Sequence, residues 1–254
     1  MKFDHYTPCD KLKPFVQSFV ISESDDENSY KVLPGTNVVI GFQYKGKLSY
    51  LSNGEEIALS NSGITGLQDS YRIFKNAPGI GSVLVYFKVN GASAFFSEPI
   101  HELFRQSLSL DNFILRSALV ILEEQLDEAN SDIERIQVVE RFLLSQLKSH
   151  KPDTLVLASI ALIFERHGNI RMSEVAEKLH TSQSPLEKRF RRTVGATPKK
   201  FASVVRLKYT LQQFQSQTSL TSLAYESGFY DQAHFIKQFK TFTGETPEHF
   251  FNKE

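Results

Sequence analysis

The stretch that decides the fold is LTSLAYESGFYDQAHFIKQFKTFTGETP, at residues 220–247. Leu223 and Ala224 are spaced as the inner face of a short helix, and the small alanine lets a second helix cross closely. Gly228 follows four residues after Ala224, where a glycine can take the positive φ that turns the chain. These positions predict a short helix followed by a tight turn.

A second helix follows this turn. Phe235 and Phe239 lie four residues apart and predict its buried stripe. Gly244 and Pro247 predict where it ends, because glycine terminates a helix and proline cannot continue it. A short helix, a turn and a second helix with a polar outer face form the helix-turn-helix pattern, whose second helix enters the major groove of DNA.

The same pattern occurs upstream in MSEVAEKLHTSQSPLEKRFRRTVGATP, at residues 172–198. Val175 and Ala176 match the inner face of the first short helix, and Leu186 and Phe190 match the buried stripe of the second. The copy also ends in a glycine that is followed three residues later by a proline. A single pattern of this kind is common by chance, whereas two in tandem are specific.

Residues 198–215, between the two copies, predict one more helix with its own apolar stripe. A stiff helix here would fix the distance between the two recognition helices, which must be about 34 Å apart to enter successive major grooves on one DNA face. The stripe consists of Phe201, Val204, Val205, Leu207, Leu211 and Phe214.

Together the two copies resemble the DNA-binding domain of AraC/XylS-type transcription regulators. The LAYESGF, DQAHFIKQFK and G-x-TP segments are similar to the hallmark region of that family, and SEVAEKLHTSQSPLEKRFRRTVGATPKKF is similar to its first helix-turn-helix. His180 departs from the family pattern, which usually has glycine there, and is expected to stiffen the turn. The resemblance covers about residues 155–254.

The first hundred residues differ in texture. NVVIGFQY (37–44) and SVLVYFKV (82–89) predict strands, and the pairs Asn53-Gly54 and Asn90-Gly91 predict turns. LKPFVQSFVI, LPGTNVVIGF and VYFKVNGASAFF resemble the β-rich sensor portion that precedes such DNA-binding domains. Residues 115–148 then predict two amphipathic helices, which cover the sheet or pair with a second subunit.

We therefore expect a two-domain α+β protein. Residues 1–150 would form a cupin-like β-sandwich or barrel with a helical hairpin, and residues 153–254 an all-α double helix-turn-helix domain. The first helix-turn-helix is expected at about 172–194, the linker helix at about 198–215 and the second helix-turn-helix at about 220–243.

Charge is unevenly distributed, although the net charge of the whole chain is zero. Residues 1–152 carry a net charge of −4 and residues 153–254 a net charge of +4. Residues 187–208 hold eight basic residues and one acidic residue, a distribution that favours a polyanionic partner over a protein partner. A solvated helix face remains the alternative.

The family resemblance implies which side chains contact DNA. In the first recognition helix, at about 182–193, the outer residues suit base contacts, and two arginines suit phosphates. Lysines at the start of the linker helix suit phosphates as well. Asp231 favours an N-cap role over base contact, and Arg189 is expected to face the linker helix. The candidates are Ser182, Gln183, Ser184, Glu187, Lys188, Arg191, Arg192, Lys199, Lys200, Asp231, Gln232, His234 and Lys237.

Enzymatic chemistry is not indicated. The β region offers only His5 and His101, which are far apart and form no H-x-H pair, and relatives that repair DNA with a zinc-bound thiol need four cysteines where this chain has Cys9 alone. We therefore expect no catalytic residue, cofactor or metal.

The expected partners are double-stranded DNA, a small-molecule effector, RNA polymerase and a second copy of the chain, the last through residues 115–148. The single cysteine and the absence of a signal peptide or a membrane-length apolar run favour the cytoplasm. An effector-independent regulator and a protein-interaction adaptor stay open as alternatives.

Overall fold

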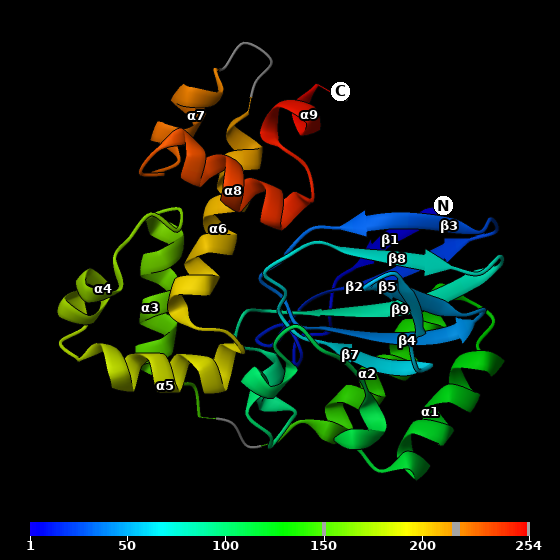
Figure 1. Cartoon of the computed structure of the whole chain (residues 1–254). Helices are drawn as coiled ribbons and strands as arrows, with labels where there is room; N and C mark the ends of the chain where they lie inside the picture. The colour runs from blue at the N-terminus through cyan, green and yellow to red at the C-terminus, as the bar shows by residue number, and fades with distance from the viewer. Residues whose placement is uncertain (149–150, 215–218, 253–254) are drawn as a thin grey trace.

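The computed structural model describes residues 1–148, 151–214 and 219–252 (Figure 1). In this described part, ten strands form two antiparallel sheets, with orders β1-β2-β9-β4-β7-β10 and β3-β8-β5-β6. The two sheets do not close into a barrel, so the β-rich region is a sandwich. The strands are β1 (Lys2–Tyr6), β2 (Val16–Ser24), β3 (Asn28–Val32), β4 (Val39–Lys45), β5 (Leu48–Ser52), β6 (Glu55–Ala58), β7 (Ser62–Thr65), β8 (Arg72–Asn76), β9 (Ile80–Phe87) and β10 (Ser107–Ser109).

The two faces of the six-stranded sheet are packed differently. Along β9, Val83, Val85 and Phe87 are fully buried in the apolar core, whereas Leu84 and Tyr86 are half-buried on the other face. Since successive side chains of a strand point to opposite faces, the apolar core lies on the helix-covered face. On the face toward the four-stranded sheet, Leu84 and Tyr86 are only half-buried.

The predicted helical hairpin is present as α1 (Arg116–Glu128) and α2 (Asp132–Gln146). It covers the six-stranded sheet (Figure 1): Phe142 of α2 packs edge-on against Phe42 of β4, with ring centroids 5.8 Å apart. Three short 3-10 helices connect the sheet to the hairpin. They are η1 (Ala92–Ala94), η2 (Ile100–Leu103) and η3 (Leu110–Asn112).

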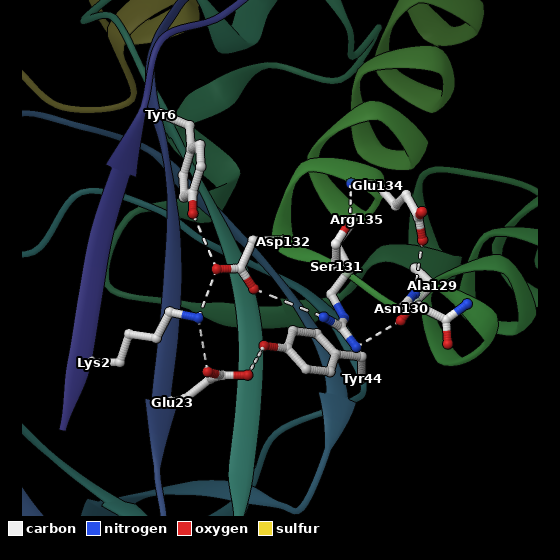
Figure 2. A network of polar contacts seen from close by, with 10 residues as sticks. All are labelled: Lys2, Tyr6, Glu23, Tyr44, Ala129, Asn130, Ser131, Asp132, Glu134 and Arg135. Atoms are coloured by element: carbon white, nitrogen blue, oxygen red, sulfur yellow. Dashed lines mark hydrogen bonds and ion pairs between the residues drawn. The ribbon is translucent and has the colours of Figure 1, made fainter.

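A polar network attaches the start of α2 to the edge of the sheet (Figure 2). The Asp132 carboxylate accepts a hydrogen bond from the Tyr6 hydroxyl at 3.0 Å and pairs with the Lys2 ammonium at 2.6 Å. Lys2 also pairs with Glu23 at 3.0 Å, and Glu23 accepts from the Tyr44 hydroxyl at 2.7 Å. The network therefore joins β1, β2 and β4 to the helical hairpin.

The C-terminal region is helical throughout its described residues. The first helix-turn-helix unit is α4–α5 and the second is α7–α8, and α6 runs between them (Figure 1). The alanines at the expected helix crossings, Ala176 and Ala224, are both buried. The helices are α3 (Thr154–Glu165), α4 (Met172–Lys178), α5 (Gln183–Val194), α6 (Pro198–Gln213), α7 (Leu220–Glu226), α8 (Gln232–Thr243) and α9 (Pro247–Phe251).

Helix α6 belongs to two apolar cores. Phe201 and Val205 pack into a continuous core that also contains the β-sandwich, α1, α2 and α3, while Val204 and Leu207 pack into the core of the second unit. Its sixteen residues make it about 24 Å long. Residue 215, the expected end of this helix, lies outside the described residues.

Among the described helices, none combines the length and the apolar character that a membrane span needs.

The two units have different residues at the same position of the turn, four residues after the buried alanine. Gly228 has a φ of +73°, as the sequence predicts, whereas His180 adopts a φ of +50° with a side chain. His180 is exposed. A left-handed conformation costs roughly 1–2 kcal/mol for a residue that has a Cβ, so the first turn carries backbone strain that the second does not.

We expect Asp132→Asn to lower the free energy of unfolding by about 1–3 kcal/mol, because Lys2 and Tyr6 lose their ionised partner. Burial raises the pKa of Asp132, but the bonds from Lys2 and Tyr6 outweigh it and leave that pKa below its ordinary value. The ionised carboxylate thus stabilises the fold above the ordinary aspartate pKa, and the stabilisation is lost as the pH falls through the lowered value.

Urea unfolding across this pH range measures the effect, and the difference between wild type and variant should shrink in acid. Asp10→Asn is the control, since the exposed Asp10–Lys13 pair should contribute little. Equal losses in both variants would contradict the role given to the network.

We expect His180→Gly to raise the free energy of unfolding by about 0.5–1 kcal/mol. Glycine relieves the left-handed strain of the folded state, and this gain exceeds the extra conformational entropy that a glycine loses on folding. Thermal or urea unfolding measures the change. His180→Ala keeps a Cβ and should give little; if alanine stabilises as much as glycine, the backbone strain is not the cause.

Candidate nucleic-acid interface

Each recognition helix has one buried face. In α5, Leu186 and Phe190 are buried, as are Phe235 and Phe239 in α8. The helices end as the sequence predicts, at Gly195 and Gly244, which both take left-handed conformations. The remaining faces of the two helices are polar and open to solvent.

The predicted DNA-contacting side chains lie on these polar faces or at helix starts. Asp231 is the N-cap of α8 and accepts a hydrogen bond from the backbone N–H of His234 at 2.7 Å, which confirms the capping role. Lys200 alone among the candidates is half-buried. The exposed ones are Ser182, Gln183, Ser184, Glu187, Lys188, Arg191, Arg192, Lys199, Asp231, Gln232, His234 and Lys237.

The outer face of α5 borders a hollow of about 620 Å³. Five predicted contacts line it together with His101, which comes from η2 in the N-terminal region. Ile100, the neighbour of His101, packs against Gly195 at the end of α5. The N-terminal region therefore forms one wall of the surface that the sequence assigns to DNA. The predicted contacts are Gln183, Ser184, Glu187, Lys188 and Arg191.

A second hollow, of about 360 Å³, lies between α6 and α8 and brings together three candidates. Lys200 comes from the first turn of α6, whereas His234 and Lys237 come from α8. Ser203, Gln238, Thr241 and Phe242 complete its C-terminal walls, and Asp69 enters from the N-terminal region. This hollow groups positive side chains from the linker helix and the second recognition helix.

Asp69 neutralises part of that positive charge. Its carboxylate pairs with the Lys200 ammonium at 3.0 Å and with the Arg105 guanidinium through two hydrogen bonds, one of them 2.8 Å long. Burial raises the pKa of Asp69, but the bonds from Arg105 and Lys200 outweigh it and hold the pKa below its ordinary value. Asp69 is thus ionised and holds the Lys200 ammonium in an ion pair.

Two further basic residues of the 187–208 stretch make internal contacts. The prediction that Arg189 faces the linker helix is wrong: its guanidinium binds Asp153, the N-cap of α3, with hydrogen bonds of 2.6 and 2.7 Å. Arg206 points into the contact between α6 and the second unit. Within the described residues, the basic side chains of this stretch that make no ion pair and stay exposed are Lys188, Arg191, Arg192, Lys199 and Lys208.

Sequence reasoning missed Asp69, Arg105 and His101. These residues belong to loops and a 3-10 helix of the N-terminal region, far in sequence from the helices that they approach. No periodicity or motif marks such positions, because contacts between distant segments bring them there, such as the packing of η2 against α5 and of Asp69 against Lys200 of α6. Arg105 has a φ of +61°, and an arginine gives no indication in the sequence that its backbone takes this left-handed conformation.

Comparison with protein families divides the chain in the same way. Residues 175–253 match a family described as a helix-turn-helix domain. Residues 4–109 match a domain family of unknown function.

Two curated relatives are bacterial regulators. The Msm operon regulatory protein of Streptococcus mutans is 28% identical over 117 residues, which cover 44% of this chain and 42% of that protein. An uncharacterised HTH-type transcriptional regulator of Staphylococcus aureus is 24% identical over 249 residues, which cover 90% of this chain and 33% of that protein. The chain thus spans less than half the length of both relatives. Neither relative is an enzyme by name.

Among solved structures, an apo ToxT variant from Vibrio cholerae has a TM-score of 0.46 at 15% identity, covering 92% of this chain and 97% of that one. The C-terminal domain of AraT, a response regulator from Geobacillus stearothermophilus, has a TM-score of 0.39 at 18% identity and covers 41% of this chain and 89% of that one. The family match and the two packed helix pairs lead to one assignment: the C-terminal region of this chain is a helix-turn-helix domain of the AraC type.

Proposed function

We propose that this chain is a transcription regulator that binds duplex DNA by inserting α5 and α8 into adjacent major grooves. The observation that carries the proposal is the separation of faces: both helices bury their phenylalanines inward and expose their predicted contacts outward. Helix α6 joins the two units as a stiff connection because both cores contain part of it.

Within the first unit, the proposal assigns different tasks to different residues. Glu187 and Lys188 lie on the outer face of α5, where glutamate can accept from cytosine N4 and lysine can donate to guanine. Arg191 and Arg192, in its last turns, suit phosphates, which supply affinity without sequence preference. Lys199 opens α6 and suits a phosphate in the same way.

The second unit is proposed to read DNA through Gln232, His234 and Lys237. Asp231 serves mainly as a helix cap there, because its carboxylate already accepts the His234 N–H. A protein-interaction adaptor would not require exposed cations on the outer faces of both units, so DNA is the partner that these surfaces favour.

The N-terminal region is proposed to control access to DNA. Asp69 holds Lys200, and DNA must replace this carboxylate with a phosphate to use that lysine. An effector would bind the half-buried face between the sheets and act through Arg72. The Arg72 guanidinium lies 4.4 Å from the centroid of the Tyr50 ring and donates to the carbonyl of Arg105 at 2.9 Å. Arg105 in turn binds Asp69. A small molecule that raises the melting temperature and changes DNA affinity together would support this route; one that changes neither would count against it.

Assembly and location follow from the same proposal. A second copy would contact the outer face of the helical hairpin, where Leu115, Ile121 and Ile133 are exposed. Sedimentation of Ile121→Asp at several concentrations tests this contact. RNA polymerase is the proposed further partner, and the cytoplasm, where bacterial DNA lies, is the proposed location.

We expect the chain to bind mixed-sequence duplex DNA with an affinity that falls steeply as salt rises, because bound cations release counterions from the phosphates. Fluorescence anisotropy over a salt series measures this.

Lys188→Ala should weaken the binding free energy for a preferred DNA sequence, selected from a random library, by about 1–3 kcal/mol and relax the preference at one base pair. Arg192→Ala should instead weaken binding evenly across sequences.

Two results would contradict this proposal. An adaptor would show no DNA binding at any salt concentration. If the protein binds DNA but both substitutions leave the affinity for the selected sequence untouched, α5 is not the first recognition helix.

We expect Asp69→Asn to tighten DNA binding, because Lys200 is released for a phosphate. The gain should be largest at low salt and should fade as salt rises. Asp111→Asn is the matched control: it removes the same charge from an exposed site on η3, away from both hollows. An equal gain from both variants would mean that net charge alone, and not the Asp69–Lys200 pair, governs affinity.

A further inference from the structure

Arg206 of α6 is a cation without an anionic partner among the described residues. Its guanidinium donates to the Gly228 carbonyl at 3.3 Å and to Oε1 of Gln238 at 2.8 Å, and it lies over the Phe229 ring at 4.2 Å from the centroid. Its Nε is buried and makes no hydrogen bond in the described structure. Burial lowers the pKa of Arg206. A charged group is costly to place there without a carboxylate, so the position calls for an explanation.

The contacts of Arg206 all belong to the second unit. Gly228 and Phe229 form the turn before α8, and Gln238 lies in the middle of α8. One guanidinium therefore joins the linker helix to both the turn and the recognition helix that follows. The planar fork suits this task because it can direct separate N–H groups at two acceptors while its face stacks on an aromatic ring.

The loop between α3 and α4 packs against both α6 and the turn before α8 at this point. A Cβ on Gly168 would lie 2.6 Å from the backbone nitrogen of Arg206, so the loop packs directly on α6 at this point. A Cβ on Gly228 would lie 2.2 Å from the Asn169 side chain, so the turn of the second unit packs on the same loop. Arg206 thus lies where the loop between α3 and α4, the linker helix and the second unit meet.

We propose that Arg206 is a positioning residue that fixes the orientation of α8 relative to α6, and with it the spacing between the two DNA segments that the protein reads. This inference rests on the proposed function, because spacing has a meaning only if both recognition helices bind one duplex. Arg206 acts through Gly228 and Gln238 rather than by touching DNA. Its loss frees α8 to bind at more than one distance from the segment that α5 reads.

The experiment is selection from a random duplex DNA library with the full chain, followed by sequencing of the bound fragments. The wild type should enrich two blocks of preferred bases at one fixed separation, about one helical turn between centres. Arg206→Met keeps an apolar stem against Phe229 and removes both hydrogen bonds. We expect it to keep the α5 block, while the fraction of fragments with the wild-type separation falls by about tenfold.

Three further variants separate positioning from charge and from stability. Arg206→Lys retains the charge but not the planar fork, so it should not restore the fixed separation. Gln238→Ala removes only the contact to α8 and should loosen the separation less than Arg206→Met does. Lys208→Met removes an exposed charge from the same helix and should leave the separation unchanged.

The outcomes are distinguishable. A folded Arg206→Met or, should that variant not fold, a folded Gln238→Ala that keeps the wild-type separation overturns the inference, as does full restoration by Arg206→Lys. In these cases the two enriched blocks still stand, and with them the proposed function. If the wild type enriches no DNA at all, the proposed function itself fails and takes the inference with it.

Discussion

Helix α6 is packed into two apolar cores, and this shared burial is the constraint on which the geometry of the helix-turn-helix region depends. Phe201, Ala202 and Val205 belong to the core that runs through the sandwich, α3 and α5, while Val204 and Leu207 belong to the core of the second unit. Neither unit can make a large rotation about the helix without withdrawing apolar side chains from its own core. The recognition helices are therefore held by hydrophobic burial and not by the connecting chain alone.

The two units are held unequally within this frame. The first has a small cluster of its own, Val175, Ala176 and Leu186, but Phe190 and Val194 of its recognition helix belong to the large core shared with the N-terminal region and α3. The second is joined by the smaller core, by the contacts of Arg206, and by the Lys31–Glu245 pair at 2.5 Å. The molecule thus holds α5 firmly, whereas the placement of α8 depends more on a few polar contacts. Polar contacts of that kind are directional, whereas apolar packing tolerates small rotations.

Much of the architecture could be predicted from local patterns. The stripe of Phe235 and Phe239, the turn at Gly228 and the helix stop at Gly244 all follow from helical spacing and backbone conformation, and each is confirmed. The β-rich texture predicted a sandwich or a barrel, and tertiary pairing of the strands decided for two open sheets.

The parts that could not be predicted depend on contacts between distant segments. Arg189 looked like a neighbour of the linker helix, but Asp153, thirty-six residues away, binds it. Asp69 lies in a loop of the N-terminal region, and only the docking of the two regions brings it to Lys200. The exposed faces of α5 and α8 follow from periodicity. Which of their cations are already neutralised follows only from the assembled fold.

The contact between η2 and α5 has a consequence for how this protein can vary. Gly195 ends the first reading helix with its backbone against Ile100, and a Cβ there would lie 2.9 Å from the isoleucine side chain. Any bulkier residue on either side of this contact would push the two regions apart and tilt the helix in the same movement. The N-terminal region and the first recognition helix thus meet at one tight contact, and a larger residue in place of Gly195 requires a compensating smaller one in place of Ile100.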